Sequence, residues 1–197
     1  MRPHLKAQAF IDRCQVEIVD LKGTYVRNAG IKSAATILLD GAELCRVEEF
    51  AARQFRRSGF EATFLQSSPF HVLFGVYFWS VIQDRCDHRV RTVGICDRHA
   101  YDQGRSSELI WIQLPADFGR LDYSRRRAEA ITKHLSAIAE TRAELLRQFD
   151  SWLAPSVGLR QYLWAHRPEA IATARKLLEL IPPVALKTVL GYLVTNY

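Results

Sequence analysis

The chain has 197 residues, which is enough for one domain or for one domain with a small satellite. Hydrophobic residues make up 48% of the chain and charged residues 24%, a balance that is typical of a globular protein and excludes a disordered one. The net charge of +6 at pH 7 favours a polyanionic partner, nucleic acid first, without requiring one.

Two features of the sequence bear on the cellular compartment. The longest apolar run, residues 70–82, is too short to span a bilayer, so no membrane association is expected. The first ten residues contain no apolar segment of a secretory signal. The expected location is the cytoplasm, where reduced thiols rather than disulfides are expected at the four cysteines, Cys14, Cys45, Cys86 and Cys96.

Residues 1–45 are predicted to form a helical N-terminal segment. Apolar residues recur at mixed spacing from 3 to about 27, which favours a helix that ends near Asn28. A second, short helix is predicted over 32–39, with its end at Asp40 and the glycine that follows.

Residues 46–197 are predicted to form a mainly helical domain with a small β element. It begins with an amphipathic helix from Arg46 to Arg57, in which Val47 and Phe50 share an apolar face. The next helix opens at Pro69, because proline is tolerated in a first turn. This second helix is apolar almost all round, so it is expected to lie at the centre of the domain.

The remaining elements of this domain follow in chain order. Residues 84–105 are polar, basic and turn-rich, whereas 107–114 are β-branched and aromatic and favour a short strand. A long helix is predicted from Asp122 to about Leu153, and Ala139 marks the place where it could break. Two more helices are predicted on either side of a proline pair, over 168–180 and 183–196.

The last of these helices ends without a capping residue, a glycine or a polar tail. An apolar helix seldom finishes a domain in this way. The sequence therefore predicts that the helix continues beyond residue 197 or docks on a protein partner.

Four potential zinc ligands lie in the polar segment, at Cys86, His88, Cys96 and His99. Their residue types suit tetrahedral zinc, but the spacing departs from the paired knuckles of zinc ribbons and fingers. The preferred interpretation is that they are thiols and surface histidines of a basic loop, and no metal site is predicted. Stoichiometric zinc in the purified protein would instead favour a small zinc protein.

Two clusters of basic residues are candidate DNA contacts. Positive side chains on a helix can bind phosphates, or they can form a solvated face whose stems cover apolar surface. From the residues alone the solvated face is the preferred interpretation of the candidates, which are Arg56, Arg57, Arg125, Arg126, Arg127 and Lys133. Asp117, near the end of the predicted strand, could be a metal ligand but is more typical of a cap or turn residue.

No catalytic motif is present. The sequence lacks phosphate-cradling glycine loops, a G-x-S-x-G elbow and an H-E-x-x-H pair. It also lacks the Pro-Asp and Glu-x-Lys elements with which metal-dependent nucleases hold a divalent cation and position the attacking water, because no glutamate is followed two residues later by lysine.

The segment RVEEFAARQFRRSGFEATFLQSSPFHVLFGVYFWSVIQD, residues 46–84, resembles the Fanconi-associated nuclease family, the large structure-specific DNA repair nucleases with a VRR-type nuclease domain. The family's Val-Glu-Glu helix is matched at Val47 and its Leu-Phe/Tyr-Gly step at Leu73. The resemblance continues with Leu114–Ile138, similar to the family's Pro-x-Asp segment and Arg-Arg helix, and with 179–197, similar to the helix before its catalytic core.

Two departures from the family pattern bear on activity. The resemblance places Gln66 where the family has a metal-ligand glutamate, and a neutral amide is a weak ligand for Mg²⁺ or Mn²⁺. The family's Gly-x-Pro-Asp and Glu-x-Lys elements would follow Tyr197. The resemblance therefore implies a truncated or degenerate relative that binds branched or flapped DNA but does not cleave it, and that needs none of the Mg²⁺ or Mn²⁺ of intact relatives. The alternative is a non-enzymatic interaction protein that docks a partner through its last helix.

Overall fold

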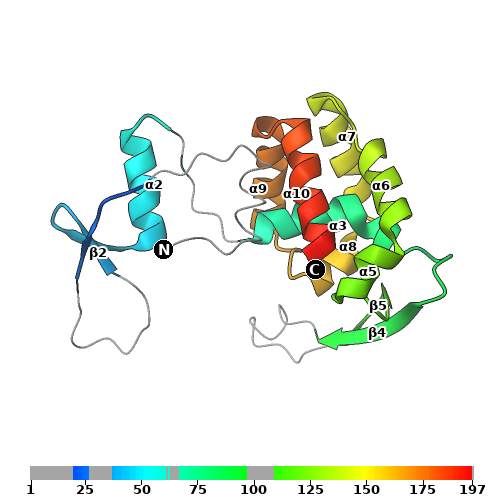
Figure 1. Ribbon diagram of the computed structural model, residues 1–197. Helices are drawn as coiled ribbons and strands as arrows, with labels where there is room; N and C mark the ends of the chain where they lie inside the picture. Colours follow the sequence, from blue (N-terminus) through cyan, green and yellow to red (C-terminus); the bar gives the residue numbers. More distant parts are fainter. Residues whose placement is uncertain (1–19, 27–36, 61, 63–66, 97–108, 197) are drawn as a thin grey trace. The chain divides into compact units, whose positions relative to one another are not determined.

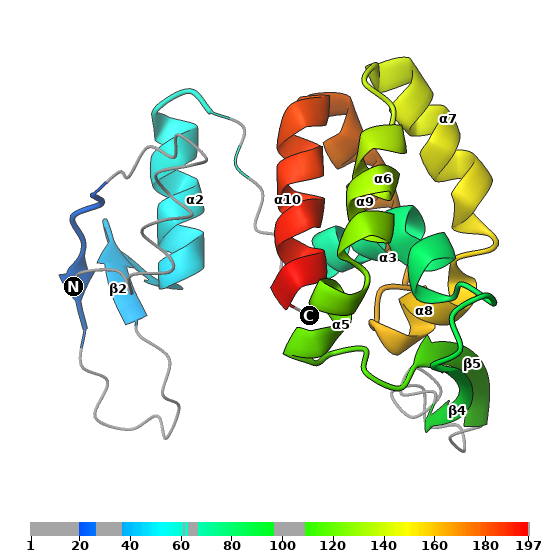
Figure 2. The ribbon, with the colours of Figure 1, turned by 45° about the vertical axis from the view of Figure 1, so that its right-hand side comes forward.

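The computed structural model describes residues 20–26, 37–60, 62, 67–96 and 109–196 (Figures 1 and 2). The chain divides into two compact units, Met1–Leu65 and Gln66–Tyr197, and each has its own hydrophobic core. The predicted fold class is confirmed, because the chain is mainly helical with a small β element.

The first unit is a small antiparallel sheet with one helix packed on it. Its strands β1 (Thr24–Tyr25), β2 (Ile37–Asp40) and β3 (Glu43–Arg46) lie in that order across the sheet. Helix α2 (Val47–Arg57), which the sequence predicts at the start of the second domain, follows β3 directly and contacts β2 and β3. The small core of this unit comprises Leu38, Cys45 and Phe50.

The helix predicted over 32–39 is wrong where it can be checked, because residues 37–40 form strand β2. Leu38 and Asp40 point inward and Leu39 outward, the alternation of a strand. Gly41 has a φ of 67°, a left-handed conformation that lets the chain reverse and pair β2 with β3. Residues 24–25 are likewise strand rather than helix. The rest of the two predicted helices, in 1–19 and 27–36, lies outside the described residues.

The second unit is built around helix α3 (Ser68–Ile82), which Figures 1 and 2 show running across the middle of a helical bundle. Ten of its 15 residues are buried, including the predicted Pro69 at the start. Because apolar side chains project from all sides of α3, it needs neighbours on all sides. Those neighbours are α6 (Ala128–Ala137), α7 (Arg142–Leu153), α8 (Val157–Tyr162), α9 (Pro168–Leu180) and α10 (Pro183–Asn196).

The long helix predicted over 122–153 is divided into α5 (Leu121–Arg126), α6 and α7. The break near Ala139 is confirmed: its amide donates to the Gln148 side chain at 3.1 Å, and Thr141 then caps α7. The helices predicted over 168–180 and 183–196 are confirmed as α9 and α10, whereas the short helix α8 was not foreseen.

A two-stranded antiparallel ribbon completes the second unit. Strand β5 (Leu109–Pro115) confirms the prediction, but its partner β4 (Val90–Cys96) lies in the segment predicted to be only turn-rich. The pairing runs from Val90 opposite Pro115 to Cys96 opposite Leu109. One face of the ribbon packs on the bundle, where β5 contacts α8.

Helix α10 buries its apolar side chains inside its own unit, against α3, α5 and α6. The buried residues are Leu186, Leu190 and Val194, spaced four apart on one face. This burial gives a reason for the apolar character of the helix, and the docking of a partner there stays a prediction. In the described part of the chain, no helix is long and apolar enough to cross a membrane.

We predict that Gly75→Ala destabilises the protein. A Cβ at Gly75 in α3 would lie 2.7 Å from Cγ of Arg160, a buried residue of α8 whose guanidinium donates to Ser156 Oγ and the Leu153 carbonyl oxygen. Overpacking of this kind costs about 1–3 kcal/mol, more than the roughly 1 kcal/mol that alanine gains over glycine in a helix. The free energy of unfolding in urea measures the effect.

Gly191→Ala is the matched control, because Gly191 also lies inside a helix. A Cβ there would meet only ordinary van der Waals contact, with Leu135 at 3.6 Å. This variant should be as stable as the wild type or more so. Equal effects of the two substitutions would contradict the tight α3–α8 contact.

Candidate nucleic-acid interface

The two arginines predicted in α2 lie in the first unit. Arg57 binds the carboxylate of Asp40 with both terminal nitrogens, at 2.6 and 2.9 Å, and thereby ties α2 to β2. The hydrogen bond from Arg57 is the main cause that lowers the pKa of Asp40. Arg56 is exposed, and its Nε donates to the carbonyl oxygen of Ala62. Arg57 thus has a structural role, whatever else it contacts.

The other four candidates lie in the second unit and do not share one environment. Arg125 projects into solvent, with its side chain 79% exposed and a long ion pair of 3.9 Å to Asp122. Lys133 of α6 is also exposed. Arg126 and Arg127 turn inward instead. Consecutive residues on a helix point in directions about 100° apart, so three arginines in a row do not form one face.

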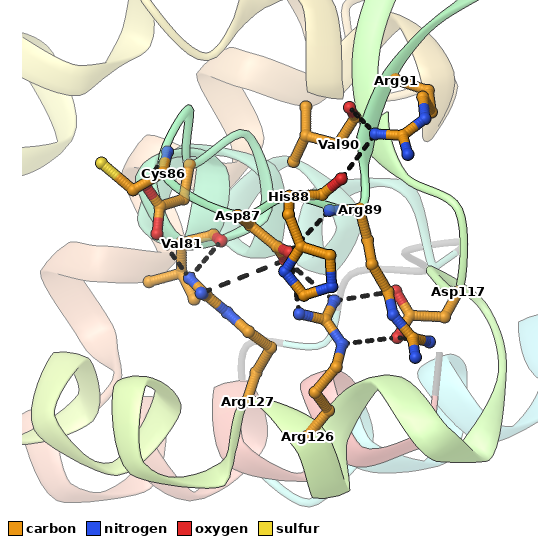
Figure 3. Close-up of polar contacts among 11 residues, drawn as sticks. Val81, Cys86, Asp87, His88, Arg89, Val90, Arg91, Asp117, Arg126 and Arg127 are labelled. Atoms are coloured by element: carbon orange, nitrogen blue, oxygen red, sulfur yellow. Dashed lines mark hydrogen bonds and ion pairs between the residues drawn. The ribbon is translucent and has the colours of Figure 1, made fainter.

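Arg126 is the centre of a buried group of ion pairs, as Figure 3 shows. Its Nε and Nη2 bind the two carboxylate oxygens of Asp117 at 2.7 and 2.9 Å, and its Nη1 donates to Asp87 Oδ1 at 2.8 Å. The side chains of Asp87 and Asp117 are only 1% and 6% exposed. Two buried carboxylates therefore share one guanidinium, a geometry that suits the planar fork of arginine.

Arg127 and Arg89 extend this group. Arg127 Nη2 donates to Asp84 Oδ2 at 2.9 Å and to the Val81 carbonyl oxygen at 3.2 Å, while Arg89 Nη1 lies 3.3 Å from Asp117 (Figure 3). We call the six residues of this group the ion-pair frame: Asp84, Asp87, Arg89, Asp117, Arg126 and Arg127.

The aspartates of the frame also shape the turn between α3 and β4. Asp84 accepts from the amide of Cys86 at 2.9 Å, and Asp87 accepts from the amide of Arg89 at 3.0 Å. Such hydrogen bonds to an amide two residues ahead are how aspartate stabilises turns. The turn is therefore held by its own backbone and by α5 at once.

The electrostatics of the frame favour ionised carboxylates. The hydrogen bond from Arg126 is the main cause of the lowered pKa of Asp117, and for Asp84 it is the backbone amide of Cys86, followed by Arg127. Burial by itself would raise the pKa of Asp87, but the hydrogen bonds from Arg126 and the Arg89 amide hold it below its usual value. Burial raises the pKa of Tyr123, which lies beside the frame, to about 12.

Exposed arginines occur on the same segments as the frame. The described residues between 84 and 127 include seven arginines and four aspartates, a local excess of three positive charges. The three buried or half-buried aspartates are occupied by arginines of the frame, so the excess lies on the outer side chains. These exposed basic residues are Arg85, Arg91, Arg120 and Arg125, with Arg89 partly exposed beside them. All of them lie on the two segments that the frame joins, the α3–β4 turn with the start of β4 and the start and end of α5, and we call these five residues the basic face.

Sequence reasoning missed four residues of this region, namely Arg85, Arg89, Arg91 and Arg120. The run DRCDHRVR, residues 84–91, signals the basic character of the turn. Nothing in it indicates that α5, some 35 residues later, binds the same turn. Asp117 lies in the turn after β5, as the preferred interpretation expects, and its carboxylate binds Arg126.

The candidate zinc ligands are not brought together. Cys86 and His88 lie in the turn before β4 and Cys96 at its far end, about 20 Å away along an extended strand. All three are exposed, and no group of metal-ligating side chains occurs among the residues that the structure describes. His99 and Gln66 both lie outside those residues.

No protein-family model matches this sequence, and no curated protein matches it either. The resemblance to the nuclease family therefore stays a prediction from the residues quoted above.

We predict that Arg126→Gln costs about 3 kcal/mol of stability at neutral pH, because it leaves two buried carboxylates without their shared cation. The neighbouring substitution Arg125→Gln is the control, and it should change stability by no more than about 0.5 kcal/mol, since this side chain is in solvent. Urea unfolding of both variants measures the difference, and similar losses from the two would contradict the frame.

The penalty of Arg126→Gln should also depend on pH. The carboxylates have lowered pKa values in the folded state, so their contribution is complete above the unfolded value of about 3.9 and is lost as the pH falls below it. Protonated aspartates no longer need a cation, so the gap between wild type and variant should narrow toward about pH 3. A gap that stays constant over this range would show that lost packing, not charge, causes the penalty.

Proposed function

We propose that this chain binds DNA and contacts its phosphates through the basic face. The observation that carries the proposal is the excess of exposed arginine on the segments that the ion-pair frame joins. The frame holds the α3–β4 turn and α5 in fixed positions, so arginines that project from them are presented on an ordered backbone. Phosphate contacts of this kind supply affinity and orientation but no sequence preference.

We propose further that the DNA is branched or flapped and that the chain does not cleave it. The nuclease resemblance supports branched or flapped DNA as the ligand and a degenerate relative of a phosphodiesterase as the protein. Gln66 in place of a carboxylate, and the lack of a Glu-x-Lys element in these 197 residues, support binding without hydrolysis and without Mg²⁺ or Mn²⁺. A cytoplasmic location is proposed as well, and the free thiols of Cys45, Cys86 and Cys96 support it.

Replacing basic-face arginines should weaken DNA binding and reduce its salt dependence. The test variant is Arg85→Gln/Arg120→Gln/Arg125→Gln. Each lost phosphate contact should lower the slope of log affinity against log salt by about one. Fluorescence anisotropy with a labelled flap DNA over a range of salt concentrations measures both quantities.

The matched control variant loses the same charge from exposed positions of α7 and α9, in Arg142→Gln/Arg147→Gln/Lys176→Gln. It should keep the slope of the wild type. Equal effects of the two triple variants would show that net charge alone governs binding, and a wild type that does not bind DNA would overturn the proposed function.

Incubation of the wild type with flap DNA in Mn²⁺ should leave the DNA intact, because the chain lacks the carboxylates and the lysine of a two-metal or one-metal nuclease site. The measurement is denaturing electrophoresis of the labelled strand. Cleavage that EDTA abolishes, and that persists after further purification, would show that the chain is an active nuclease.

A further inference from the structure

The outer face of the β4–β5 ribbon carries a tryptophan in solvent. Trp111 is 66% exposed, whereas the next residue, Ile112, is 3% exposed and points into the core. In the cross-strand register Trp111 lies opposite Gly94, and the polar pair Thr92 and Gln113 lies beside them on the same face. The ribbon thus buries one face against the bundle and displays the other.

Gly94 lets the indole lie flat on the ribbon. A Cβ at Gly94 would lie 3.3 Å from Cζ3 of Trp111 and 3.5 and 3.6 Å from the two ring atoms bonded to it. A ring that met this position edge-on would hold those two atoms clearly farther away than the nearest one. The ring therefore lies broadside on the glycine, with one side covered by the backbone and the opposite side toward solvent.

Exposed arginines lie at the base of the same ribbon, although the alternation along β4 assigns Arg91 to the face opposite Trp111. Arg91 lies three residues before Gly94 on β4, about 10 Å along the strand. It is exposed, and its Nη1 donates to the carbonyl oxygens of His88 and Val90, which hold the guanidinium at the base of the ribbon (Figure 3). Arg89, also partly exposed, lies next to it. Cations at the base of the ribbon and an open aromatic ring farther along it are therefore on opposite faces, and a polyanion that contacts both must pass over the edge of the ribbon.

We propose that Trp111 stacks on an unpaired base of single-stranded DNA whose phosphates contact Arg89 and Arg91. The inference rests on the proposed DNA binding and names the part of a branched or flapped DNA that the ribbon would take. The positive charges of Arg89 and Arg91 favour a polyanion as the ligand. The exposed ring of Trp111 favours a polyanion whose bases are unpaired. Single-strand-binding proteins combine these two features, whereas the bases of a duplex are already stacked on each other.

Trp111→Ala should lower the affinity for a single-stranded oligothymidine of about 20 nucleotides by about tenfold, as expected when one stacking side chain is lost. Affinity for a duplex of the same length should not change. Trp111→Phe should retain most of the single-strand affinity, because it keeps an aromatic face. Anisotropy titrations at one salt concentration measure all of these, and Tyr25→Ala, which removes a 74% exposed aromatic side chain from the first unit, is the control.

A second variant tests the geometry without removing the tryptophan. Gly94→Val places a side chain where the indole now lies, so the ring must leave its flat position. Valine is favoured in strands, so folding should be preserved, and circular dichroism checks this. The same loss of single-strand affinity is expected, together with loss of the fluorescence quenching that stacking causes in the wild type.

The outcomes separate this inference from the proposed function. If Trp111→Ala and Gly94→Val leave single-strand affinity unchanged while the basic-face triple variant weakens binding, the stacking site is refuted and DNA binding stands. If the wild type binds neither single-stranded nor duplex DNA, both fail. Equal losses on single-stranded and duplex DNA would also refute stacking, and tighter binding of the matching RNA would overturn the assignment to DNA.

Discussion

The burial of α3 on all its sides is the constraint on which the second unit depends. A helix with apolar side chains all round exposes them to water unless other elements cover every face, and five helices contact it here. These neighbours pack closely enough to favour small residues: α8 approaches α3 at Gly75, where a larger residue would force Arg160 to shift. Because α8 in turn supports β5, the position of the ribbon follows from the packing around α3.

The ion-pair frame lies where this apolar helix ends. Arg127 donates to the carbonyl oxygen of Val81, one of the last carbonyls of α3, which have no partner within the helix. The frame contributes little net stability compared with an apolar contact of the same size, since its charges are partly desolvated. The frame instead fixes the relative positions of the α3–β4 turn and α5, because any arrangement that leaves a buried charge without its partner is strongly destabilised. Two of the three consecutive arginines are used in this way, and only Arg125 is left fully in solvent.

The parts of the fold that the sequence predicted are those with a strong local signal. Helices α3, α9 and α10 begin at or next to prolines, and α2 has a clear apolar face. The four residues of strand β2 carry no local signal that separates a helix from a strand, so the sequence wrongly predicts a helix there. Their pairing with β3 makes them a strand. The different directions of Arg125, Arg126 and Arg127 also depend on distant residues. Helical geometry predicts that the three side chains point in different directions, but aspartates far away in the sequence determine which of them point inward.

The candidate interface shows the same dependence on distant residues. Asp87 precedes the start of β4 by three residues, and Asp117 follows the end of β5 by two, so the two carboxylates flank the base of the ribbon. Arg126 binds both, and the amide of Ala116 donates to the Arg89 carbonyl oxygen at 2.9 Å beside them. One guanidinium thus fastens both strands where they leave the bundle. Because the paired strands extend from this point, with β5 also packed on α8, the orientation of Trp111 depends on Arg126 as well as on α8. In the proposed complex Arg126 contacts neither DNA nor the tryptophan.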